Sequence, residues 1–336
     1  MVDLWLRKRM NHPVLSALLP VVLLIAIGFL AGKRNRISAG SVKDLSNLVF
    51  LILIPALLFR TMGAVHLEKL DLKPVGIYFL TTGIIFTAVL VWQGLSRRAT
   101  VVALASIFSN TIMIGVPLVS LAYGEAALVY LFTLISLHAL VLLTLATVVL
   151  EFAVMRERTQ HAKTEAGQLA NNQNKSRDTA ASIAKNVVLA MRNAVIHPVP
   201  LPIIAGLLFA QTGWAIPAVV DRPLQLLGSA FGPLALVLVG VTLAHTQVGA
   251  HIKGAFAISL VKNALHPALM AAMGWAFGLS GMPLTVVIVA ASLPVGANVF
   301  LFSQRYHVAQ ELITASVAIT TAVALVSVSL VMAWLS

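Results

Sequence analysis

Two short segments combine asparagine, glycine and proline at a spacing that could bind an anion. Residues 109–117 read SNTIMIGVP, and residues 292–298 read SLPVGAN. A proline inside a helix removes one backbone hydrogen bond and clashes with the preceding turn, so each segment predicts an interrupted helix. The helix N-termini at such interruptions carry partial positive charge and unpaired N–H groups, which favour a carboxylate. Asparagine adds hydrogen-bond donors without the cost of a buried charge.

The recurrence of this pattern predicts one paired binding site. A single helix kinked by proline is common in membrane proteins and is equally well explained as an ordinary structural feature. The same residue types appear in two distant segments, which favours a shared site over two unrelated kinks. The residues that we expect to line this site are Asn110, Gly115, Pro117, Pro294, Gly296 and Asn298.

The composition places these segments in a lipid bilayer. Of the 336 residues, 59% are hydrophobic and 10% are charged, which leaves too few polar side chains to cover a water-soluble globule. A membrane-spanning helix needs about 20 mostly apolar residues. Such stretches are predicted at residues 13–32, 42–65, 74–95, 99–123, 126–154, 187–213, 224–246, 255–281, 283–306 and 313–335.

These stretches form two groups of five around a hydrophilic segment. Residues 156–186 have almost no large apolar side chains, which predicts a linker. We therefore expect a tail at 1–12, a first repeat at 13–155 and a second repeat at 187–336. An odd number of spans per half predicts an all-α polytopic membrane protein whose repeats are inverted. Prolines at corresponding places support a duplication: Pro55 and Pro233 in the second spans, Pro117 and Pro294 in the fourth.

The basic residues indicate membrane topology. The formal net charge is +12, but Lys and Arg stand in short clusters between apolar runs instead of one stripe, so nucleic-acid binding is not expected. Most clusters share the side of the linker, which predicts a cytoplasmic linker and both termini outside, in a bacterial inner membrane. The chain has no cysteine, which excludes disulfides, thiolate metal sites and cysteine nucleophiles.

Three motifs resemble the auxin efflux carrier family, which includes plant PIN transporters and bacterial carriers of malonate and malate. They read DLSNLVFLILIPALLF, SNTIMIGVPLVSLAYGE and LPVGANVFLFSQRYHV, and the similarity spans nearly the whole chain. The resemblance implies ten helices in two inverted five-helix repeats. It also implies a scaffold domain and a transport domain, broken helices four and nine that cross at their prolines, and elevator-type alternating access.

The resemblance also implies roles for single residues. Asn110 would contact the substrate carboxylate, Asn298 would line the same crossing, and Asn47 is an accessory residue of the second-helix motif. His138 stands where plant members carry a substrate-facing glutamine, although a lone histidine on an apolar helix is equally well a packing residue. Leu58 replaces a substrate-contacting serine of plant carriers, and the linker is short. The expected substrate is therefore a small mono- or dicarboxylate, malonate- or malate-like or auxin-like, and auxin itself is the less expected cargo.

Lys262 and His266, one helical turn apart, form a second candidate group. A buried cation there could attract the anion or take part in a proton-linked step. Alternatively, Lys262 extends to the cytoplasmic interface. No Asp or Glu falls near the middle of a predicted span, so a paired-carboxylate site for sodium or protons is not expected. The choice of coupling ion, proton or sodium, stays open, as does a homodimer.

Two other functions compete with a carrier of organic anions. The same broken helices could line a passive channel. Residues 278–281 read GLSG, a pattern that rhomboid-type proteases use around a catalytic serine, but they lie in a predicted turn before Pro283 and no histidine is assignable at matching depth. No HExxH, Walker A or paired-metal spacing is present, so neither a cofactor nor a metal is expected. The expected partners are a small organic anion and the lipid bilayer.

Overall fold

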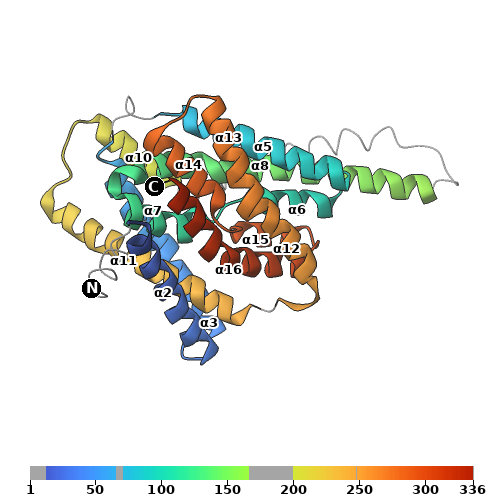
Figure 1. Cartoon of the computed structure of the whole chain (residues 1–336), viewed down its shortest axis with the longest axis horizontal. Coiled ribbons are helices and arrows are strands. Elements are labelled where there is room, and N and C mark those ends of the chain that lie inside the picture. Colours follow the sequence, from blue (N-terminus) through green and yellow to red (C-terminus); the bar gives the residue numbers. More distant parts are fainter. Residues whose placement is uncertain (1–12, 66–70, 166–199, 247, 336) are drawn as a thin grey trace, which may run out of the picture.

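The computed structural model describes residues 13–65, 71–165, 200–246 and 248–335, so the predicted tail and the linker beyond residue 165 lie outside it. Every regular element in these ranges is helical (Figure 1). The helices are α2 (Pro13–Lys33), α3 (Ala39–Leu48), η1 (Val49–Leu53), α4 (Ile54–Met62), α5 (Lys73–Gln93), α6 (Arg97–Ile107), η3 (Thr111–Gly115), α7 (Val116–Tyr123), α8 (Glu125–Glu165), α10 (Pro200–Gln211), α11 (Ala218–His245), η4 (Gly249–His251), α12 (Ile252–Leu260), η5 (Val261–Leu265), α13 (His266–Ala276), α14 (Gly281–Ser292), α15 (Asn298–Arg305) and α16 (Gln310–Leu335).

Length and hydropathy suit these helices to a bilayer. Within the described ranges, six continuous helical stretches are long and apolar enough to cross a membrane, and four shorter helices are also apolar. These helices confirm the prediction of an all-helical protein with several membrane-spanning segments. The division into ten spans and two inverted repeats stays a prediction.

Helix α8 is longer than its predicted span. It continues from Glu125 to Glu165, so its last part occupies residues that the sequence assigned to the linker. Figure 1 shows this light green end reaching beyond the neighbouring helices. The side chain of Arg97, at the start of α6, donates to Glu157 at 2.6 Å. This ion pair holds the start of α6 against α8.

Three prolines each follow a π-helical turn. Pro55, Pro117 and Pro267 occupy the first or second position of α4, α7 and α13, directly after η1, η3 and η5. The N–H of the residue before each proline bonds to a carbonyl five residues back, as from Val116 to Thr111. A π turn widens the helix by one residue, which relieves the clash of the proline ring with the preceding turn. At these three prolines the helix therefore continues with a local bulge.

Pro233 does not interrupt its helix in this way. Helix α11 runs without a break from Ala218 to His245, although Pro223 and Pro233 both lie inside it. The expected correspondence between Pro55 and Pro233 therefore does not extend to local structure, because only Pro55 follows a π turn.

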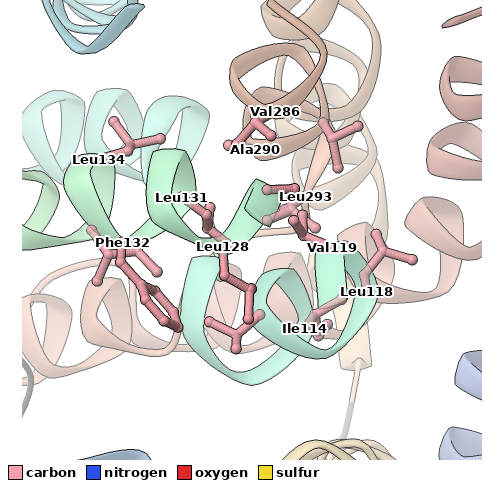
Figure 2. Close-up of a cluster of buried hydrophobic side chains, with 14 of the residues drawn as sticks. Ile114, Leu118, Val119, Leu128, Leu131, Phe132, Leu134, Val286, Ala290 and Leu293 are labelled. Atoms are coloured by element: carbon pink, nitrogen blue, oxygen red, sulfur yellow. The ribbon is translucent and has the colours of Figure 1, made fainter. Parts of the chain in front are cut away.

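The hydrophobic core consists of two clusters that meet at the two predicted interruptions. Ile114 and Leu293 belong to the first cluster, whereas Phe108 and Val295 belong to the second. Figure 2 shows part of the first cluster, where side chains of α7 and α8 face those of α14 and Leu293. Each interrupted segment therefore passes from one packed cluster to the other.

Candidate functional site

The two interrupted segments lie side by side and pair through a short antiparallel bridge. Ser109 and Val295 form an isolated antiparallel bridge. The N–H of Asn110 donates to the carbonyl of Pro294 at 2.8 Å, and the N–H of Gly296 donates to the carbonyl of Phe108 at 2.9 Å. This exchange satisfies backbone groups that the helix breaks would otherwise leave unpaired. We refer to residues 108–110 and 293–297 as the crossover.

The first interruption lies earlier than the sequence predicted. Helix α6 ends at Ile107, and the chain is extended at Phe108, whereas Pro117 lies within α7. The expected break at Pro117 is therefore wrong in position, because the π turn η3 already accommodates this proline. A Cβ placed at Gly232 of α11 would lie 3.6 Å from Pro117, so the proline packs against α11. Pro294, in contrast, lies within the second break.

The two site glycines permit close packing. A Cβ at Gly115 would lie 2.7 Å from Leu293, and a Cβ at Gly296 would lie 2.8 Å from the ring of Phe108. Their N–H groups are engaged inside the protein, since Gly115 donates to the carbonyl of Asn110 at 3.1 Å and Gly296 donates across the crossover. Donors to a ligand must therefore come from other groups.

Asn110 and Asn298 provide such donors. Asn110 is partly exposed, and its side-chain oxygen accepts the N–H of Met113 at 3.2 Å, which caps η3. Its side-chain NH₂ has no partner within the described chain, and the same holds for the backbone N–H groups of Ala297 and Asn298 at the start of α15. Because the bridge is antiparallel, η3 and α15 leave the crossover in opposite directions. The two helix N-termini thus flank the crossover.

A buried polar chain supports the crossover from α5 and α8. The hydroxyl of Tyr78 lies 3.1 Å from Oγ of Ser109 and 3.3 Å from Nε2 of His138. The ring of His138 also packs on Phe108, with ring centroids 4.6 Å apart. All three polar side chains are almost completely buried. His138 is therefore brought to the crossover, through a tyrosine that sequence reasoning did not single out.

Removing the Tyr78 hydroxyl is expected to destabilise the protein. In Tyr78→Phe, Ser109 and His138 lose a buried hydrogen-bond partner, which costs about 1–3 kcal/mol for each unsatisfied group. The thermal unfolding midpoint in detergent should fall clearly below that of the wild type. Tyr130→Phe is the control, because the partly buried Tyr130 hydroxyl has no hydrogen-bond partner among the described residues. Equal midpoints for the two variants would contradict this role of Tyr78.

Lys262 belongs to η5, and its side-chain nitrogen lies at the C-terminal end of α14. This nitrogen is fully buried, donates to the carbonyl of Ala291 at 2.6 Å and lies 3.4 Å from Nδ1 of His266. Asn263 beside it donates to the carbonyl of Ser292 at 3.3 Å. A cation at a helix C-terminus is favourable, because the last carbonyls carry partial negative charge. The alternative in which Lys262 extends to the interface is wrong.

The remaining candidate residues lie apart from these contacts. Asn47 is exposed on α3, and no hydrogen bond within the described chain ties it to the crossover. Leu58 is fully buried in α4 and belongs to the first hydrophobic cluster. Ser280 of the GLSG sequence is exposed in the turn before α14, between Gly278 and Gly281, both of which have positive φ. These positions match the turn that the sequence predicts.

A separate cavity of about 600 Å³, lined by both apolar and charged residues, opens between α4, α8, α10 and α11. Arg60 binds Asp221 at 2.7 Å on its wall and lies 3.9 Å from Glu125. The three charged groups come from three different helices, so the ion pairs connect α4 with α8 and α11.

Comparison with known proteins agrees with this architecture. The family model described as membrane transport protein matches residues 13–332. Auxin efflux carrier component 8 of Arabidopsis thaliana is 24% identical over 342 residues, which cover 91% of this chain and 93% of the relative. A putative malonate transporter of Rhizobium meliloti (strain 1021) is 25% identical over 324 residues and 94% of each chain. Auxin efflux carrier component 3a of Oryza sativa subsp. japonica is 30% identical over 145 residues, only 24% of its length.

The family match includes every helix that forms the crossover and both hydrophobic clusters. The two relatives aligned over almost their full lengths are named as transporters, and the helices of this chain are apolar enough to span a bilayer repeatedly. The chain is therefore a multi-pass membrane transporter that belongs to the membrane transport protein family, to which auxin efflux carriers and malonate transporters are related.

Proposed function

We propose that this protein is a secondary carrier for a small organic anion, a mono- or dicarboxylate, which binds beside the crossover. The observation that carries the proposal is the pairing of two interrupted helices across the bridge between Ser109 and Val295. This pairing brings helix N-termini and partly exposed, unpaired donors together within an apolar protein.

The donors that serve the anion are the side-chain NH₂ of Asn110 and, across the crossover, the N–H groups at the start of α15. The side-chain nitrogen of Lys262, at the C-terminal end of α14, can carry a positive charge. Together these groups favour binding of an anion through hydrogen bonds and long-range electrostatics, and no charged side chain contacts the anion directly. A small dicarboxylate fits the proposal because one relative is named as a putative malonate transporter, whereas Leu58 keeps a buried apolar side chain in the second-helix motif.

Alternating access would follow from movement of the crossover helices as one body, in the manner of an elevator. The second hydrophobic cluster joins α5, α6, α12, α16 and the later part of α8 with Val295 and Val299 of the crossover region, and would form the core of this moving body. The distribution of basic residues supports a cytoplasmic linker, external termini and the inner membrane of a bacterium.

Reconstitution tests the carrier directly. In proteoliposomes, the purified protein is expected to take up radiolabelled malonate with saturable kinetics, and malonate trapped inside should accelerate uptake of label from outside. Such counterflow requires a site that faces one side at a time, so a channel would not show it. Indole-3-acetate, unlabelled malonate and chloride serve as competitors, of which malonate should compete best. Absence of uptake for every carboxylate tested would refute the proposed function.

A further inference from the structure

We propose that Lys262 binds one proton for each anion that the carrier moves, so that the protein is a proton–anion symporter. The inference rests on the proposed function and adds the identity of the coupling ion. It is carried by the burial of the Lys262 and His266 side chains, by their contact with each other and by the absence of a carboxylate at this place in the described chain.

The Lys262 side chain is held at the crossover and away from water. Both Lys262 and His266 have an exposed fraction of 0%. The amine contacts the carbonyl of Ala291 at 2.6 Å, and Asn263, oriented by Ser259 at 3.1 Å, holds the next carbonyl. These carbonyls end α14 directly before the extended segment that contains Pro294. A charge on Lys262 therefore acts on the backbone of the crossover itself.

The side chains of Lys262 and His266 can carry only one positive charge between them. Nζ of Lys262 and Nδ1 of His266 are 3.4 Å apart, and two charged groups at this distance inside the protein would repel each other strongly. When Nδ1 accepts a hydrogen bond from the lysine, the imidazole is neutral and carries its hydrogen on Nε2. That atom is buried without a partner in the described part of the chain. The pair is thus not satisfied by protein groups alone.

The elements packed around the pair supply no resident counter-ion. From α5, the Tyr78 ring approaches the His266 ring with centroids 5.6 Å apart, and His138 of α8 lies on the far side of the Tyr78 hydroxyl. Helix α14 has no ionisable side chain. Helices α6, α12 and α16 carry charged residues only near their ends, namely Arg97, Arg98, Lys253 and Glu311. Of these, Glu311 contacts His251 at 3.1 Å.

An ammonium group in this position lacks a negative partner until an anion arrives. A buried charge without a counter-ion costs free energy, and the anion at the crossover removes part of that cost. By linkage, the anion then favours protonation of Lys262, and protonation favours binding of the anion to the same degree. The two ligands are therefore expected to bind and leave together.

The proton balance of one transport cycle is simple. On the side of entry, one proton passes from water to the Lys262 amine, and the anion binds at the crossover. After reorientation the anion leaves, and the ammonium returns its proton to water on the other side. One proton and one anion cross in the same direction, and neither an oxidant nor a further co-reactant is required.

Proteoliposomes that contain the pH dye pyranine test this coupling. Valinomycin and equal potassium concentrations clamp the membrane potential, and malonate is added outside at a pH at which it is fully ionised. The wild type should acidify the lumen as malonate enters. Lys262→Arg keeps a permanent charge and Lys262→Met removes it, so acidification per malonate should fall at least about tenfold in both. Lys253→Met, at an exposed position of α12, should retain wild-type coupling.

A calorimetric measurement on the wild type tests proton coupling even if both Lys262 variants fail to fold. Malonate is titrated into the purified wild type in two buffers that differ in ionisation enthalpy, and the difference in heat gives the protons taken up. We expect about one proton per malonate by the linkage above. Malonate uptake without proton uptake overturns symport but leaves the carrier intact, and so does unchanged coupling in Lys262→Arg. Failure of the wild type to transport malonate or other carboxylates instead removes the proposed function.

Discussion

Replacing Asn110 by aspartate is expected to weaken malonate binding at least about 100-fold while the protein stays folded. The aspartate keeps an oxygen that can accept the N–H of Met113, so the cap of η3 is preserved. It replaces the unpaired NH₂ by a negatively charged oxygen. Like charges brought together in a binding site cost several kcal/mol, and each 1.4 kcal/mol is about a factor of ten in affinity.

Binding of malonate to the purified variant and counterflow in proteoliposomes measure this effect. Asn35→Asp is the matched control, because Asn35 is exposed in the turn after α2 and aspartate tolerates its left-handed backbone conformation. This control should bind malonate as the wild type does. A thermal midpoint close to that of the wild type would establish that Asn110→Asp is folded. Wild-type affinity in a folded Asn110→Asp variant would place the anion elsewhere.

The crossover could be predicted in outline because its signal is local. Proline, glycine and asparagine recur in two short segments, and each feature changes backbone hydrogen bonding within a few residues. The position of the first break could not be predicted in the same way. A π turn accommodates Pro117, and the chain becomes extended at Phe108 because a distant segment offers hydrogen bonds there. Backbone pairing between residues far apart in sequence cannot be predicted from the composition of either segment alone.

The contacts of the buried polar residues could also not be predicted from the sequence. The sequence left Lys262 either as a buried cation or as an interfacial lysine, because the carbonyl of Ala291 that it contacts belongs to the end of another helix. Tyr78 lies among apolar residues of α5, and its importance follows from contacts with Ser109 and His138. Helix periodicity identifies which residues share a face, but it does not identify which helix end that face meets.

Replacing Gly240 by valine is expected to prevent stable folding, because it separates α2 from α11. A Cβ at Gly240 would lie 2.0 Å from the carbonyl oxygen of Ile25, and a Cβ at Gly28 would lie 1.9 Å from that of Val237. The two backbones thus touch through glycines, and Figure 1 shows the helices crossing. Small residues allow such contact between membrane helices. The obstructing atoms belong to backbone, so a rotamer change cannot relieve the overlap.

The expected cost of Gly240→Val exceeds the roughly 1–3 kcal/mol of ordinary overpacking, since the helices must move apart along their contact. Size-exclusion chromatography in detergent should show little monodisperse protein and a thermal midpoint far below that of the wild type. Gly83→Val is the control, because a Cβ at Gly83 in α5 meets no atom within 4 Å. Normal yield and midpoint for Gly240→Val would mean that α2 and α11 can separate without loss of the fold. The first hydrophobic cluster, which includes Val21, Ile25 and Leu238 from these helices, would then have to tolerate their rearrangement.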